Sequence, residues 1–174
     1  MAAGNQHLET VPRTPPHVRV QLLSQARYLS GARDLVAAIA KRYGFEDQVS
    51  GQMALAIDEA LCNVLRHGYS GADDKPIWLS IWPLCETTGQ PAGGIRIVIE
   101  DEARQVDPSV IKGRDLAEIR PGGLGVYIIQ QVMDHARYEK RSGAQGGMRL
   151  VMAKAVAPAT EKSGAACETT ASRG

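Results

Sequence analysis

Glu59 and Asn63 are the first residues whose types and spacing suggest chemistry. They lie four positions apart in AIDEALCNVLRHG, where apolar residues recur every three or four positions. On a helix this spacing places both side chains on one face, about one turn apart. A carboxylate can act as a general base, and an amide oxygen can ligate a hard cation. Taken alone, the pair is more typical of an ordinary polar helix surface.

Two further segments suggest ligand binding. Asp101 directly follows IRIVIE, where a carboxylate can accept a hydrogen bond from an exocyclic amine such as that of adenine. It can equally cap the next turn. The segment PGGLG at 121–125 places three glycines at the start of an apolar-periodic stretch. This pattern predicts a helix, and the N–H groups at a helix N-terminus attract phosphate. A hinge or a plain turn would use the same residues, and GAQGG at 143–147 indicates a hairpin turn.

The elements that position these residues follow from the hydrophobic periodicity. Three stretches have the helical period, five have strand-like alternation, and residues 102–121 keep no period. A loop of that length predicts a functional loop or lid. We expect strands at 18–24, 77–84, 95–101, 136–142 and 148–156, and helices at 28–44, 49–68 and 122–134.

The order of these elements predicts an α+β fold. The strands cluster as hairpins instead of alternating singly with helices. We therefore expect a two-layer sandwich, in which a mixed, mainly antiparallel sheet carries the helices on one face. Residues 17–156 form the predicted domain, and 1–16 and 157–174 read as flexible tails because they lack apolar periodicity.

Composition narrows the class of protein. The 174 residues suit one domain, and 44% hydrophobic with 22% charged residues is ordinary globular usage. The formal net charge is only +1, without a basic run that would follow a nucleic-acid backbone. We find neither an apolar span of membrane length nor a signal-like start, so we expect a cytoplasmic protein. Three widely separated cysteines favour neither disulfides nor a zinc site.

Taken together in this order, the motifs resemble those of a known family. Glu-x-x-x-Asn on a helix, Asp after a strand, Gly-Gly-x-Gly before a helix and Gly-Gly before the last strand are similar to the Bergerat-fold (GHKL) ATPases. Within that superfamily, IDEALCNVLRHGY and GGLGVYIIQQVMD look most like the anti-sigma-factor serine kinases of bacterial partner-switch systems. The resemblance covers about residues 18–156, which is all except the predicted tails.

The resemblance implies a role for each matching residue. Glu59 matches the general base, Asn63 the Mg²⁺ ligand, and Asp101 the carboxylate that reads adenine. Arg66 occupies a place where relatives often carry a phosphate-contacting cation, although a surface role fits it equally well. The phosphate-wrapping segment matches Gly122, Gly123, Leu124, Gly125 and Val126. His67 is interpreted as structural. Arg104, Lys112, Arg114 and Arg120 in the preceding loop could neutralise triphosphate charge, although solvated loop cations are the more typical interpretation.

Two positions depart from the family pattern. Ala103 stands where relatives carry glycine two residues after the adenine-binding Asp, and its Cβ puts a glycine-specific backbone angle or a close approach of adenine in doubt. Met148 stands where relatives tend to carry Thr, so a hydroxyl near the base is missing. Both departures concern purine binding and leave the Glu59–Asn63 pair untouched.

The resemblance implies an ATP- and Mg²⁺-dependent serine/threonine protein kinase. Its expected partners are a small anti-anti-sigma protein of the STAS type, as phosphorylation substrate, and a sigma factor or another regulatory target. Relatives often form homodimers, whereas nucleic acid and membrane are not expected partners. One alternative is a non-catalytic module that binds nucleotide or a partner through the same fold. Another is a detached histidine-kinase ATPase domain that phosphorylates a histidine.

Overall fold

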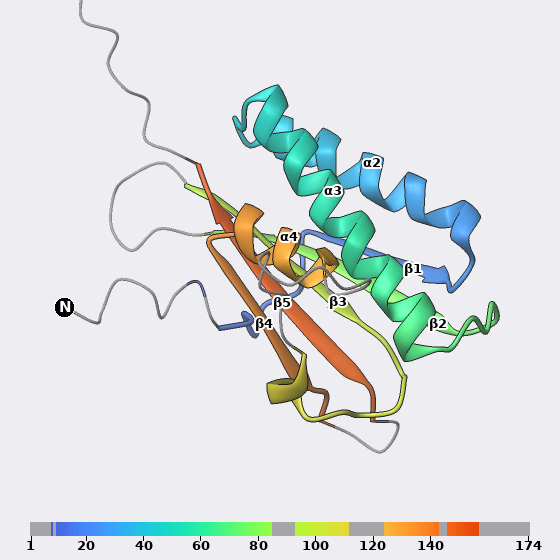
Figure 1. Cartoon of the computed structure of the whole chain (residues 1–174). Coiled ribbons are helices and arrows are strands. Elements are labelled where there is room, and N and C mark those ends of the chain that lie inside the picture. The colour runs from blue at the N-terminus through green and yellow to red at the C-terminus, as the bar shows by residue number, and fades with distance from the viewer. Residues whose placement is uncertain (1–7, 9, 85–92, 112–123, 143–145, 157–174) are drawn as a thin grey trace, which may run out of the picture.

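The computed structural model describes residues 8, 10–84, 93–111, 124–142 and 146–156. They form two layers, with the helices on one face of a five-stranded sheet (Figure 1). The elements are β1 (Val18–Leu23), α2 (Ala26–Arg42), α3 (Asp47–Asn63), the π-helical turn η1 (Val64–Gly68), β2 (Pro76–Pro83), β3 (Gly94–Glu100), the 3₁₀ turn η2 (Pro108–Val110), α4 (Leu124–Val132), β4 (His135–Lys140) and β5 (Met148–Ala155). The predicted order and the α+β class are confirmed.

The sheet has the strand order β1-β2-β3-β5-β4, and every neighbouring pair is antiparallel. The sequence predicts a mixed, mainly antiparallel sheet, and the described strands include no parallel pair. In the register of β3 with β5, Ile99 faces Leu150 and Glu100 faces Arg149. The end of β3 therefore lies beside the start of β5, which brings Asp101 next to Met148.

The main core lies between the sheet and the helices. Strand alternation turns Ile95, Ile97 and Ile99 of β3 toward α3, whose Ile57 and Leu61 are fully buried. Gly44 is the second residue after the end of α2 and has φ +89°, the left-handed conformation in which a glycine commonly ends a helix. Among the described residues, no helix is long and apolar enough to cross a lipid bilayer.

Helix α3 does not end as a regular α-helix. Its last turn widens into η1, where the amide of Tyr69 donates to the carbonyl of Val64 at 2.8 Å. Such π-turns are uncommon and occur frequently at functional sites. Here the widened turn directly follows Asn63 and presents His67 and Gly68 to the cavity described below.

An N-terminal strap, which we define as residue 8 with residues 10–16, crosses the sheet face opposite the helices. Leu8 is buried against Leu84 and Ala153, and Val11 packs on the cluster formed by Trp82, Val98 and Val151. The indole Nε1 of Trp82 also donates to the carbonyl of Thr14 at 2.9 Å. This part of the predicted flexible tail therefore makes ordered contacts, because its few apolar residues cover an apolar patch of the sheet.

Candidate functional site

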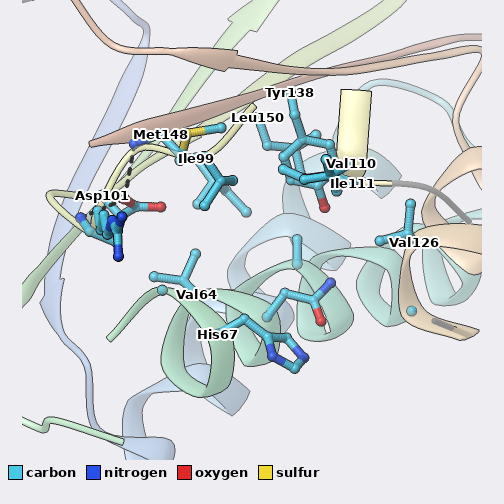
Figure 2. A pocket seen from close by; sticks show the side chains of 17 residues that line it. Val64, His67, Ile99, Asp101, Val110, Ile111, Val126, Tyr138, Met148 and Leu150 are labelled. Carbon is cyan, nitrogen blue, oxygen red and sulfur yellow. Dashed lines mark hydrogen bonds between the residues drawn. The ribbon is translucent and has the colours of Figure 1, made fainter. Parts of the chain in front are cut away.

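A cavity of about 370 Å³ lies between the C-terminal part of α3 and the ends of β3, β4 and β5. Figure 2 shows Asp101 and Met148 toward one end, Val126 toward the other, and Val64 and His67 along one side. Most of the wall is apolar, with a few polar groups facing inward, as is usual for small-molecule sites. Ile99, Val64, Ile111, Val126 and Leu150 contribute to the apolar wall.

Asp101 forms the buried acidic end of the cavity. Its side-chain Oδ1 accepts the backbone N–H groups of Ala103 at 2.8 Å and Met148 at 3.0 Å, so Oδ2 is free of these two bonds. Asp101 is only 5% exposed. Burial raises the pKa of its carboxyl, and the two backbone hydrogen bonds oppose that shift. The geometry leaves one carboxylate oxygen able to accept a hydrogen bond from a ligand.

The two departures from the family pattern fit this end of the cavity. Ser70 is the only non-glycine residue with positive φ in the described part of the chain, so Ala103 needs no glycine-only conformation. Its methyl group packs against Gly68, where a Cβ would lie 3.1 Å from the Ala103 Cβ. Met148 lacks the hydroxyl of a Thr, yet its backbone N–H still orients Asp101.

Glu59 and Asn63 lie beside the first turn of α4. A Cβ placed on Gly125 would come within 2.6 Å of Glu59 Oε2 and 3.4 Å of Asn63 Nδ2. Glycine therefore allows the α4 backbone to approach the face of α3 that carries both residues. Asn63 and Gly125 line the cavity, whereas Glu59 lies next to Gly125 and is not itself a lining residue. The predicted pairing of Glu59 and Asn63 on one helix face agrees with this arrangement.

Tyr138 is a cavity residue that the sequence motifs missed. It projects from β4 opposite Leu150, and burial raises the pKa of its phenol, a shift that the nearby Asn63 amide opposes. That amide nitrogen is buried without a well-formed hydrogen bond to any described residue. Strand alternation could have placed Tyr138 on the inner face, but nothing in the sequence links it to Asn63.

The buried Asn63 amide and the close approach at Gly125 fit the groups that the resemblance implies. Rotating the Asn63 amide by half a turn exchanges nitrogen for oxygen, so this position can supply a hard ligand to Mg²⁺. Within the described ranges, no cluster of three or more His, Cys, Asp or Glu could hold a metal. Phosphate oxygens and water would therefore have to complete the coordination of a cation held by Asn63.

The remaining predicted site residues are divided among three locations. Val126 lines the cavity together with Arg104 and His67, so neither Arg104 nor His67 is merely a solvated or structural residue remote from the site. Leu124 begins α4 with an exposed side chain, and Arg66 is exposed on η1 and is not among the lining residues. Gly122, Gly123, Lys112, Arg114 and Arg120 lie outside the described residues.

Tyr69 braces the acidic end from outside the cavity. Its hydroxyl donates to the carbonyl of Pro76 at 2.6 Å and accepts the N–H of Glu102 at 2.7 Å. Burial raises the pKa of Tyr69 to about 12, so the phenol stays protonated near neutral pH. The residue after η1 thus holds the backbone directly after Asp101.

Comparisons with known proteins place this geometry in context. The family model described as a histidine kinase-like ATPase domain matches residues 22–154. The chain is 27% identical over 141 residues to a serine-protein kinase RsbW of Listeria monocytogenes, covering 79% of this chain and 85% of that protein. It is 25% identical over 141 residues to the serine-protein kinase RsbW of Bacillus subtilis, covering 76% and 83%.

Proposed function

This chain belongs to the family of histidine kinase-like ATPase domains, and from that premise we propose that it is an ATP- and Mg²⁺-dependent protein serine/threonine kinase. The proposal extends to an anti-sigma-type regulator. Its substrate would be a small STAS-type anti-anti-sigma protein, and its second partner a sigma factor or another regulatory target. The curated relatives named serine-protein kinase support this choice over a histidine-directed ATPase domain.

One observation carries the proposal. Asp101 lies at one end of a single cavity, and Asn63 and Gly125 face the same space, with Glu59 next to Gly125. A purine amine can donate to the free oxygen of Asp101, while the triphosphate extends toward the first turn of α4. The apolar wall between these groups suits the faces of a base.

Each of these residues would have a separate role in phosphoryl transfer, which depends mainly on positioning and charge neutralisation. Asn63 would hold Mg²⁺, which when bound neutralises phosphate charge. Glu59 would accept the proton of the attacking serine hydroxyl. The hydroxyl oxygen bonds to the γ-phosphorus, the bond from that phosphorus to the bridging oxygen breaks, and ADP leaves. The first turn of α4, which contains Gly125, would contact the phosphates.

Transfer of one phosphate can switch partners because it changes a local charge. A phosphoserine adds nearly two negative charges to a protein surface at neutral pH. At an interface formed by the unmodified hydroxyl, this charge favours release by repulsion and by the cost of desolvation. The kinase would then be available to its other target.

The test is transfer of labelled phosphate from MgATP to a STAS-domain protein encoded in the same genome. We expect Glu59→Gln to lower the transfer rate at least about a hundredfold, since a general base contributes that much. Asp58→Asn is the matched control, because this neighbouring carboxylate on α3 is not among the groups nearest to Gly125 and does not line the cavity. Transfer by Glu59→Gln at the wild-type rate would contradict the assigned role.

Two further readouts separate the alternatives. Phosphoserine survives acid, whereas phosphohistidine does not, so an acid-labile product would identify histidine transfer. Titration calorimetry with MgATP addresses the non-catalytic module. Failure to bind at millimolar nucleotide would favour that module, and binding without transfer to any STAS-domain protein would indicate a nucleotide sensor.

A further inference from the structure

Arg141 lies just after β4, outside the cavity, yet it contacts the backbone of the buried acidic end. Its Nη1 donates to the carbonyl oxygen of Asp101 at 2.6 Å. Asp101 is the first residue after β3, and its N–H still pairs with the Met148 carbonyl at 3.1 Å. Beyond that bond the strand ladder ends. The Asp101 carbonyl therefore takes a side-chain donor where a strand would otherwise supply a backbone one.

The guanidinium of Arg141 is held on several sides. Its Cζ lies 4.9 Å from the centre of the Trp78 ring, and its Nε lies 3.5 Å from a carboxylate oxygen of Glu100. Trp78 is itself fixed, because its Nε1 donates to the side chain of Gln21 at 3.1 Å. A planar cation stacked on an aromatic ring and paired with a carboxylate has little freedom to leave.

The backbone of Arg141 is anchored as firmly as its side chain. Its N–H donates to Gly147, and its carbonyl accepts the side-chain amide of Gln105 at 2.8 Å. Gly147 has φ +99°, and a Cβ there would overlap the carbonyl of Asp101. Glycine thus lets the β4–β5 connection close on the end of β3, and Arg141 donates to the same carbonyl.

We propose that Arg141 is a positioning residue for base recognition, which acts by fixing the Asp101 backbone so that the free carboxylate oxygen faces the purine. This inference rests on the proposed function, because it concerns how that nucleotide site selects its base. Arg141 is not a lining residue of the cavity, so its effect on binding must pass through Asp101. Adenine donates from its exocyclic amine, whereas guanine presents an acceptor at the corresponding position. A misplaced Asp101 would therefore cost affinity for adenine nucleotides and leave guanine nucleotides almost unaffected.

The test compares binding of MgADP and MgGDP by titration calorimetry, since neither nucleotide supports transfer. We expect Arg141→Met to raise the Kd for ADP about tenfold, as suits loss of one hydrogen bond from a charged donor. The Kd for GDP should change less than twofold. Arg141→Lys keeps the charge and can still donate one hydrogen bond to the Asp101 carbonyl. Its Kd for ADP should therefore fall between those of the wild type and Arg141→Met.

Arg149→Met is the matched control. Arg149 pairs with Glu100 at 2.8 Å, as Arg141 does at a longer distance, but it has no bond to Asp101. Its loss should leave both nucleotide affinities unchanged. If Arg141 acts through Asp101, adding Arg141→Met to Asp101→Asn should not weaken ADP binding further.

The outcomes distinguish failure of the positioning role from failure of the nucleotide site. Wild-type affinity in Arg141→Met, an equal loss of ADP and GDP, or additive effects with Asp101→Asn would each overturn the positioning role while leaving the nucleotide site in place. Failure of the wild type to bind ADP at all would overturn the proposed function, and this inference with it.

Discussion

The first turn of α4 lies against the carboxylate of Glu59 at Gly125, so a side chain at residue 125 would have to displace that carboxylate. A Cβ at residue 125 would approach Glu59 Oε2 to 2.6 Å. Gly125 is buried in the first turn of α4, and its backbone does not have the positive φ that only glycine adopts easily. Contact with the Glu59 side chain, and not backbone conformation, therefore favours glycine at this position.

Gly125→Ala should separate the Glu59 carboxylate from the start of α4. Alanine suits a helix better than glycine, so any loss comes from the steric contact. We expect phosphotransfer to fall about a hundredfold, because a displacement of roughly 1 Å near a reacting centre can have that effect. The rate of labelled phosphate transfer measures it.

Gly51→Ala is the control for this substitution. Gly51 lies in α3, and a Cβ there meets nothing within 4 Å. We expect unchanged transfer and a gain of about 0.5–1 kcal/mol in the free energy of unfolding. Equal activity of the two alanine variants would show that the contact with Glu59 does not matter for transfer.

The buried carboxyl of Asp101 should make the stability of the folded protein depend on pH in a specific direction. Its pKa in the folded protein lies above the ordinary value of 3.8, chiefly because of burial. The folded state therefore binds the proton more tightly than the unfolded state does. Relative to Asp101→Asn, the wild type should gain stability as the pH falls from above the folded pKa toward 3.8. It should lose that gain as the pH rises through the folded pKa.

Urea unfolding between pH 7 and pH 4 measures this difference in the free energy of unfolding. Asn has the same shape and does not titrate in this range, so subtraction removes the contributions of the other carboxylates. If the wild type instead lost stability relative to Asp101→Asn on acidification, the hydrogen bonds to Oδ1 would outweigh burial.

Gly68 and Ala103 should behave as a coupled pair. A Cβ on Gly68 would lie 3.1 Å from that of Ala103, closer than most real contacts. We expect Gly68→Ala to lower the free energy of unfolding by about 1–3 kcal/mol, as overpacking does. Ala103→Gly in the same chain should recover most of that loss. A double-mutant cycle by thermal or urea unfolding provides the measurement, and simple additivity would contradict the contact.

The N-terminal strap should shield the Trp82 side chain from solvent. Asp substitutions at Leu8 and Val11 would remove the two apolar contacts that the strap makes with the sheet. We expect a loss of about 1–3 kcal/mol, because burial of each aliphatic side chain is partly offset by the entropy cost of ordering the strap. In a Trp78→Phe background, the remaining Trp82 emission should shift to longer wavelength and become accessible to acrylamide.

Arg13→Ala controls for the loss of charge balance in the strap, since Arg13 is exposed. Its Trp82 emission should match that of the parent. An unchanged emission in the Leu8/Val11 variant would mean that the strap does not cover Trp82 in solution.

Local patterns in the sequence are sufficient to predict much of the fold. The period of α3 and the alternation of Ile95, Ile97 and Ile99 reflect which side chains must leave water, and this holds before any packing is known. The spacing of Glu59 and Asn63 placed them together because a helix repeats about every four residues. The η1 turn was missed, since a π-turn keeps the same apolar residues and changes only the hydrogen bonding.

The sequence by itself determined the order of elements, the acidic and amide residues of the site and the family motifs that contain them. Only the tertiary structure decided what surrounds those residues. Arg141 contacts Asp101 across 40 positions of sequence, Tyr138 meets Asn63, and the strap covers Trp82. These contacts depend on strand order and register, which bring distant segments side by side. A one-dimensional pattern records which face a side chain occupies, but not which neighbour it meets there.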